Sequence, residues 1–215
     1  MLVSAQRLLS RAVCTAAAGL TLACASTSYA QSNFTVNVIT QPLVGSVSAP
    51  FSIDFQFNDG GILGNNSVTI SNFSYSGGGA SGAATLLGGA LGDVASIVTF
   101  DNSNAFQELF QSFTPGTTLS FDVLLTNNSD VIAPDAFVFA ILDSNLANIP
   151  TTGLGDSLLL VSLDASLSSV QTFAGTGAFA GVTVTTAPVP EPEIVAMMLA
   201  GMGLLGFVAR RRRSA

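Results

Sequence analysis

Residues 31–189 contain no lysine, arginine, histidine, cysteine or tryptophan. All six basic residues of the 215-residue chain are arginines that lie before or after this stretch, which we call the body. Without cations the body cannot neutralise phosphate groups, so nucleic-acid binding is excluded as its function. Because His, Cys and Lys are absent, the body cannot form a Ser-His-Asp, Cys-His or Ser-Lys catalytic arrangement. For the same reason it cannot build a zinc site from His or Cys ligands.

These absences also limit how the body is held together. Cys14 and Cys24 both precede residue 31, so the body forms no internal disulfide bond. Its ten aspartates and one glutamate give it a net charge of −11, against −7 for the whole chain, and no basic side chain is present to form salt bridges with them. We therefore expect packing and hydrogen bonds to hold the fold, and the negative charge to favour solubility.

The N-terminus is typical of a secretory signal peptide. Arg7 and Arg11 precede an apolar stretch over residues 12–25, and Ser28-Tyr29-Ala30 places small residues at the −3 and −1 positions of a cleavage site. The pattern predicts a signal helix within residues 1–30, export through the Sec translocon, and cleavage between Ala30 and Gln31.

The C-terminus combines a proline-rich motif, one apolar run and a basic end. Val189, Pro190, Glu191 and Pro192 are followed by an apolar run over residues 194–209 and then by Arg210, Arg211, Arg212 and Arg213. A helix over 194–209 would be roughly 24 Å long, close to the ~30 Å hydrocarbon core of a bilayer. We predict a transmembrane helix there, with residues 210–215 in the cytoplasm and the body outside it, because arginine clusters mark the cytoplasmic side.

In this order the three parts resemble the PEP-CTERM sorting signal of Gram-negative bacteria. The same tail is also labelled an ice-binding protein C-terminal domain, which describes the tail and not the body. The resemblance implies that an exosortase, a membrane cysteine protease, recognises the motif and cleaves near it. The body would then be transiently anchored in the membrane and pass to the cell surface or the extracellular matrix. Exopolysaccharide of a biofilm matrix is the implied partner there.

The body shows the period-two alternation of half-buried β-strands. The alternation covers Phe34–Val38, Phe51–Phe57, Val68–Tyr75 and Leu119–Leu125, while residues 137–142, 158–163 and 182–186 are further strand candidates. Only residues 103–113, with apolar side chains at four-residue spacing, indicate a helical turn. About eight or nine strands separated by turn residues predict an all-β fold, an antiparallel, jelly-roll-like β-sandwich. It would span residues 31–186 and be followed by a stiff Pro-rich linker over 187–193.

Two Asx-rich segments are candidates for a calcium site. Asp101 and Asn104, with Glu108 nearby, and Asp130 in the second segment offer the oxygen ligands that calcium prefers, but neither segment has EF-hand spacing. Turn formation explains the same residues and is the favoured interpretation, because Asn and Asp bond to neighbouring backbone groups. We therefore predict no cofactor, and calcium is the one alternative.

Catalysis by carboxylates has little support in the sequence. A glycosidase needs two placed carboxyl groups, and nothing in the sequence pairs Glu108 with an aspartate. We predict that the chain is not an enzyme and has no catalytic residues, but is an exported surface or matrix protein with a structural or adhesive role. The alternative is a carbohydrate- or calcium-binding extracellular module, since a β-sandwich is a common lectin scaffold although fold alone does not define function.

Overall fold

The computed structural model describes residues 30–61, 66–101, 103–128, 133–163, 168–189 and 199–203. The predicted signal helix, Pro190, Glu191, Pro192 and Arg210 to Arg213 lie outside these ranges, as does Asp130. The predicted transmembrane helix over 194–209 is described only at residues 199–203, which are helical. Within the described ranges, no helix has both the length and the apolar character needed to cross a membrane.

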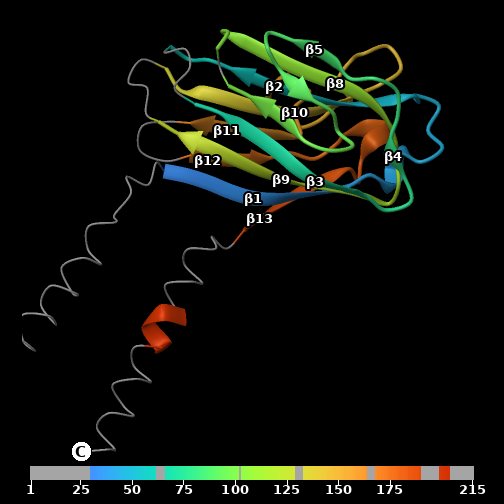
Figure 1. Cartoon of the computed structure of the whole chain (residues 1–215). Helices are drawn as coiled ribbons and strands as arrows, with labels where there is room; N and C mark the ends of the chain where they lie inside the picture. Colours follow the sequence, from blue (N-terminus) through green and yellow to red (C-terminus); the bar gives the residue numbers. More distant parts are fainter. Residues whose placement is uncertain are drawn as a thin grey trace, which may run out of the picture. The chain divides into compact units, whose positions relative to one another are not determined.

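The described body consists of two antiparallel sheets, which confirms the predicted all-β sandwich (Figure 1). The first sheet contains β1 (Ala30–Ile39), β3 (Val68–Tyr75), β6 (Leu91–Gly92), β7 (Val98–Phe100), β9 (Thr118–Asn127) and β13 (Thr183–Pro188). The second contains β2 (Phe51–Asn58), β4 (Gly79–Ala80), β5 (Thr85–Leu87), β8 (Phe106–Thr114), β10 (Asp135–Leu142), β11 (Leu159–Leu163) and β12 (Ser168–Thr172). Short 3-10 helices occur at Gln41–Leu43, Leu154–Asp156 and Gly177–Phe179.

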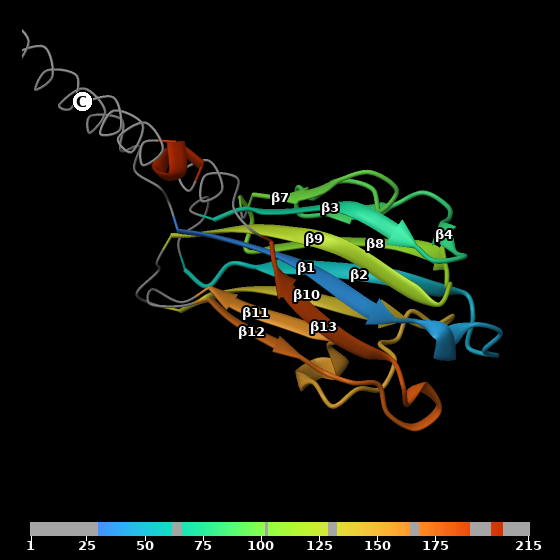
Figure 2. The same ribbon diagram turned by 90° about the horizontal axis from the view of Figure 1, so that it is seen from below.

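The chain passes repeatedly between the two sheets, although some successive strands stay in the same sheet. The first sheet has the order β13-β1-β9-β3-β7-β6, and the second has the order β12-β11-β10-β2-β8-β4, with β5 also pairing with β8 (Figure 2). The strands outnumber the eight of a simple jelly roll. One reason is that β10, β11 and β12 form an antiparallel meander that widens the second sheet.

Phenylalanine rings fill the space between the sheets. Phe55 of β2 lies 5.2 Å from Phe121 of β9 and 5.4 Å from Phe139 of β10, measured between ring centroids. All three rings are fully buried. Because each buried phenylalanine contributes roughly 1.5–3 kcal/mol, packing of this kind can hold a fold that has neither disulfides nor salt bridges.

The helical turn predicted over residues 103–113 is wrong, because Phe106–Thr114 is the strand β8. Its inner face carries Gln107, Leu109, Gln111 and Phe113, all of them buried. The two glutamines interrupt the apolar alternation that identifies a strand. What remained visible in the sequence was the four-residue spacing of Leu109 and Phe113, which imitates a helix.

A β-bulge lies in the middle of β3. The inward residues Val68 and Ile70 are followed by Phe73, three positions later, so strict alternation would point Phe73 to solvent. The pairing with β9 shifts register between Ser71 and Ser74, and Asn72 has a φ of 55°. The extra residue returns Phe73 to the inner side, where it packs against the core.

The first and last strands of the body are neighbours. Ile39 pairs with Thr183 and Phe34 with Pro188, and the backbone nitrogen of Val189 donates a hydrogen bond to Asn33 O at 3.0 Å. The sandwich therefore extends two residues into the predicted linker over 187–193. Val189, the first residue of the proline-rich motif, is bonded directly to β1.

Candidate functional site

The outer face of the seven-stranded sheet carries a polar cluster formed by Asp54, Gln56 and Glu108. Side chains alternate between the two faces of a strand. Since Phe55 and Phe57 of β2 point into the core, Asp54 and Gln56 point outward. The register of β2 with β8 places Gln56 opposite Glu108. The three side chains therefore lie on one face, although Glu108 is far from the other two in sequence.

One amide group links the two carboxyl groups. Gln56 Nε2 donates to Asp54 Oδ2 at 2.8 Å and to Glu108 Oε1 at 3.4 Å. Since an amide nitrogen has two hydrogens, it can serve both acceptors at once. Gln56 thus ties two acidic side chains of neighbouring strands together.

Asp54 is buried although it lies on the outer face. Only 1% of it is exposed, and its Oδ1 atom has no hydrogen-bond partner among the described residues. Burial, and after it the charge of Glu108, raise the pKa of Asp54 from 3.8 to about 7, against the lowering effect of the bond from Gln56. A carboxyl group in this position holds its proton near neutral pH.

Apolar side chains border the polar cluster. Phe106 and Phe110 flank Glu108 on the outer face of β8, and Leu87 of β5 pairs with Glu108. On the other side, Val138 of β10 pairs with Gln56. Phe106 and Leu87 are 41% and 47% exposed, so this border is open to solvent. The arrangement combines hydrogen-bonding groups with exposed apolar surface.

The predicted calcium ligand Asp101 has a structural role in the observed contacts. Its Oδ1 accepts hydrogen bonds from Gln107 Nε2 at 2.7 Å, from Ser103 Oγ at 2.7 Å and from Ser103 N at 3.1 Å. The bond from Gln107, followed by those from Ser103, holds the pKa of Asp101 below its usual value. The contact with Ser103 N is the Asx turn that the sequence favoured.

The remaining predicted ligands do not join Asp101. Asn104 Nδ2 donates to Gly88 O at 2.8 Å, and Glu108 lies on strand β8, where its Oε1 accepts a hydrogen bond from Gln56 Nε2. Asp130 falls outside the described ranges. No group of three or more His, Cys, Asp or Glu residues suited to a metal ion occurs where the structure is described. Calcium at this loop stays a prediction.

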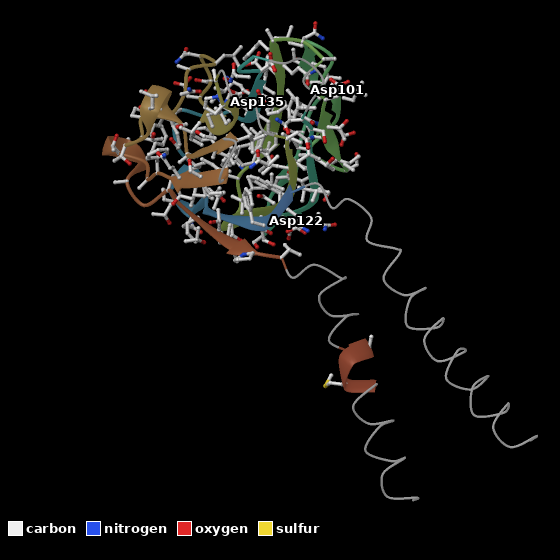
Figure 3. All side chains as sticks on the ribbon, turned by 90° about the vertical axis from the view of Figure 1, so that its left-hand side faces the viewer. Asp101, Asp122 and Asp135 are labelled. Atoms are coloured by element: carbon white, nitrogen blue, oxygen red, sulfur yellow. The ribbon has the colours of Figure 1, made fainter. Side chains whose placement is uncertain are left out.

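Two further aspartates fix parts of the fold. Asp122 accepts hydrogen bonds from Thr35 Oγ1 at 2.5 Å and Asn72 Nδ2 at 2.8 Å, which connects β9 to β1 and to the bulge of β3. Asp135 is fully buried and accepts from Gly60 N and Asn66 Nδ2, each at 2.7 Å. Figure 3 shows Asp101, Asp122 and Asp135 at three separate places on the sandwich.

The sequence did not reveal the pairing of Asp54 with Glu108. Asp54 was visible only as a polar position of an alternating strand, and Glu108 was assigned to a helical turn. The missing information was that residues 106–114 form a strand beside β2. The alternation of Phe106, Glu108 and Phe110 on one face was the signal that could have identified it.

The tail matches a known family description. The PEP-CTERM protein-sorting motif matches residues 188–213, which confirms the resemblance drawn from the proline-rich motif, the apolar run and the arginines. The chain therefore carries a PEP-CTERM sorting domain, which marks an extracellular protein that is anchored in the membrane and sorted by an exosortase to the cell surface. No curated protein and no solved structure matches the chain.

Proposed function

We propose that this PEP-CTERM sorting domain-containing protein is a structural or adhesive component of the surface or exopolysaccharide matrix of a Gram-negative bacterium, without catalytic activity. The observation that carries the proposal is the position of the sorting motif. Its match begins at Pro188, the last residue of β13. Cleavage near the motif would therefore release the complete sandwich, after export by the Sec translocon and removal of residues 1–30.

The chemistry of the body supports a role without catalysis. Its versatile side chains are carboxylates, hydroxyls and amides, because the basic residues and cysteines are confined to the two ends. Asp54 and Glu108 are neighbours, but Asp54 is only 1% exposed, which is too little for an organic substrate to be held between the two carboxyl groups. A surface or matrix protein needs a stable, soluble body, and the net charge of −11 favours solubility.

The sorting part of the proposal is tested by changing the motif. In cells that contain an exosortase, we expect the wild-type protein at the surface or in the medium to lack Arg210 to Arg213 by mass spectrometry. The double variant Pro190→Ala/Glu191→Ala should remain in the membrane fraction with its arginines. Asp143→Asn, a change at a partly exposed position in the body, serves as the control and should be processed normally. Surface protein that retains the arginines would show a permanent anchor instead.

The structural or adhesive role is tested separately. A strain whose chain lacks residues 31–186 but keeps both sorting segments is compared with the parent strain. We expect it to attach less to surfaces and to retain less exopolysaccharide. Equal attachment and equal retention in the two strains would reject the role.

Carbohydrate binding is a second candidate, supported by the outer face of the seven-stranded sheet. Phe106 and Phe110 could pack against the C–H faces of a sugar while Gln56 and Glu108 bond to its hydroxyl groups. In a glycan array with and without calcium, we expect saturable binding that Phe106→Ala weakens. Val170→Ala, at an exposed position of β12, should leave binding unchanged. Absence of saturable binding, or equal binding by the Phe106 variant, would reject this candidate.

A further inference from the structure

The charge of the Asp54–Glu108 pair has no counterpart in the body. The two carboxyl groups are bonded to the same amide, at 2.8 Å and 3.4 Å. No lysine, arginine or histidine occurs between residues 31 and 189, so no basic side chain of the body can balance the pair. Solvent can supply a counter-charge, either as a proton or as a metal ion.

One oxygen of the pair is available to a ligand. Asp54 Oδ1 is buried and has no hydrogen-bond partner in the described part of the chain, while Asp54 Oδ2 accepts from Gln56. Buried polar atoms are almost always partnered, because an unmet acceptor has lost its water without replacement. An atom of this kind beside a second carboxylate is where a bound cation would be stabilised.

Among the described residues, the strands beside Asp54 direct one further titratable group toward it, Glu108. Its neighbour on β10 is Ala140, with Val138 one row away, and its neighbour on β8 is Phe110. Beyond β8, β5 contributes Thr85 and Leu87. Glu108 is thus the one titratable side chain that these strands direct toward Asp54. Apolar neighbours lower the local dielectric, which strengthens attraction between the pair and a cation.

We propose that Asp54, Gln56 and Glu108 form a binding site for a calcium ion. Asp54 Oδ1 and a carboxylate oxygen of Glu108 supply two ligands. A half-turn of the Gln56 amide exchanges its nitrogen and oxygen, which places Oε1 between the two carboxylates as a third. Calcium accepts carboxylate, amide and water oxygens in flexible geometry, whereas magnesium requires a nearly ideal octahedron. Solvent would complete the coordination on the half-buried side of Glu108.

This site shares Glu108 with the Asx-rich segment indicated by the sequence, but it uses Asp54 and Gln56 in place of Asp101 and Asn104. Asp101 Oδ1 already accepts three hydrogen bonds, whereas Asp54 Oδ1 accepts none in the described chain. The inference goes beyond the proposed function, which requires no metal. Asp101→Asn is therefore the matched control for changes at the new site.

The test uses thermal unfolding of the full-length chain in a mild detergent at pH 8. Calcium chloride should raise the melting temperature by several degrees relative to EDTA, because a ligand that binds only the folded state stabilises it. The rise should disappear in Asp54→Asn and in Glu108→Gln, and should persist in Asp101→Asn. At pH 5 it should become much smaller, because a proton then occupies the pair.

Three results would overturn the site. They are no calcium-dependent rise in the wild type, a rise of unchanged size in Asp54→Asn, and an equal rise with sodium chloride at the same ionic strength. Failure to fold does not complicate the test, since Asp54→Asn keeps the shape of the side chain and removes a buried charge. Isothermal calorimetry with calcium on the wild type and on both variants provides a second readout, with heat of binding expected for the wild type alone.

Discussion

The side-chain oxygen Oε1 of Gln111 accepts a hydrogen bond from the backbone nitrogen of Val94 at 2.9 Å. Gln111 faces inward from β8, and its Nε2 donates to Gly82 O, also at 2.9 Å. Through these two bonds one buried side chain holds two loops against the sandwich. Gln111, one of the two glutamines that interrupt the apolar alternation of β8, therefore stabilises the fold.

Replacing this residue should loosen both loops. In Gln111→Leu, the buried Val94 N–H loses its partner, and we expect a loss of roughly 1–3 kcal/mol in the free energy of unfolding. Urea denaturation gives the energy, and hydrogen exchange at Val94 should become faster. Gln171→Leu, at an exposed position of β12, should change neither quantity. An unchanged exchange rate at Val94 in Gln111→Leu would contradict the assignment.

Asp54 should make the protein less stable at alkaline pH when divalent cations are removed. Its pKa is about 7 in the folded state and 3.8 as the reference value, so folding takes up a proton between these limits. The free energy of unfolding should therefore fall as pH rises from 3.8 toward about 7, by a few kcal/mol, and level off above. In EDTA, Asp54→Asn should be more stable than the wild type at pH 8 and show a smaller slope.

Asp143 provides a control of opposite sign. Backbone hydrogen bonds from Ala147 and then Asn145 hold the pKa of this exposed carboxylate below its usual value. The ionised Asp143 therefore contributes to the free energy of unfolding at neutral pH, and this contribution is lost as pH falls. Asp143→Asn should therefore not raise stability at pH 8. An increase equal to that of Asp54→Asn would show that general charge repulsion, and not the buried pair, causes the pH dependence.

The bulge of β3 can be tested with a pair of variants at one position. Both Asn72→Gly and Asn72→Val remove the hydrogen bond to Asp122. Only valine is strained at a φ of 55°, because its branched Cβ clashes in the left-handed region. We expect Asn72→Val to unfold at lower denaturant concentration, with a difference of about 1–2 kcal/mol between the variants. Equal stabilities would mean that the bulge rearranges without cost.

Asp135 should be the aspartate least tolerant of replacement. The two carboxylate oxygens of Asp135 accept hydrogen bonds from Gly60 N and Asn66 Nδ2. Asp135→Asn replaces one of these buried acceptors with an NH2 group, so that a donor then faces another donor. We expect a loss of about 2–4 kcal/mol in chemical denaturation. Asp156→Asn, at a partly exposed site that accepts from Thr151 N, should cost about 1 kcal/mol or less. Similar losses at the two sites would argue against burial as the cause.

The sequence predicted the strands whose inner face is uniformly apolar. The prediction failed at β8, whose inner face also carries two glutamines. The alternation of Phe51, Phe55 and Phe57 identified β2, and the tail motif identified the sorting domain. Strand order and register could not be predicted, because they depend on contacts between residues far apart in the chain. For the same reason Glu108 could not be paired with Asp54. The burial of Asp54 was equally hidden, since a polar residue in an alternating strand is expected to face solvent.

The pairing of β1 with β13 has a consequence for the order in which the sandwich folds. Until Thr183–Pro188 arrives, β1 has β9 on one side and unpaired backbone groups on the other. Such an open strand edge is a template for association with other chains. Joining Ile39 to Thr183 also closes a loop that includes most of the body, and contacts of this range form slowly. A chain interrupted during export would thus be prone to aggregation until the residues just before the sorting motif have emerged.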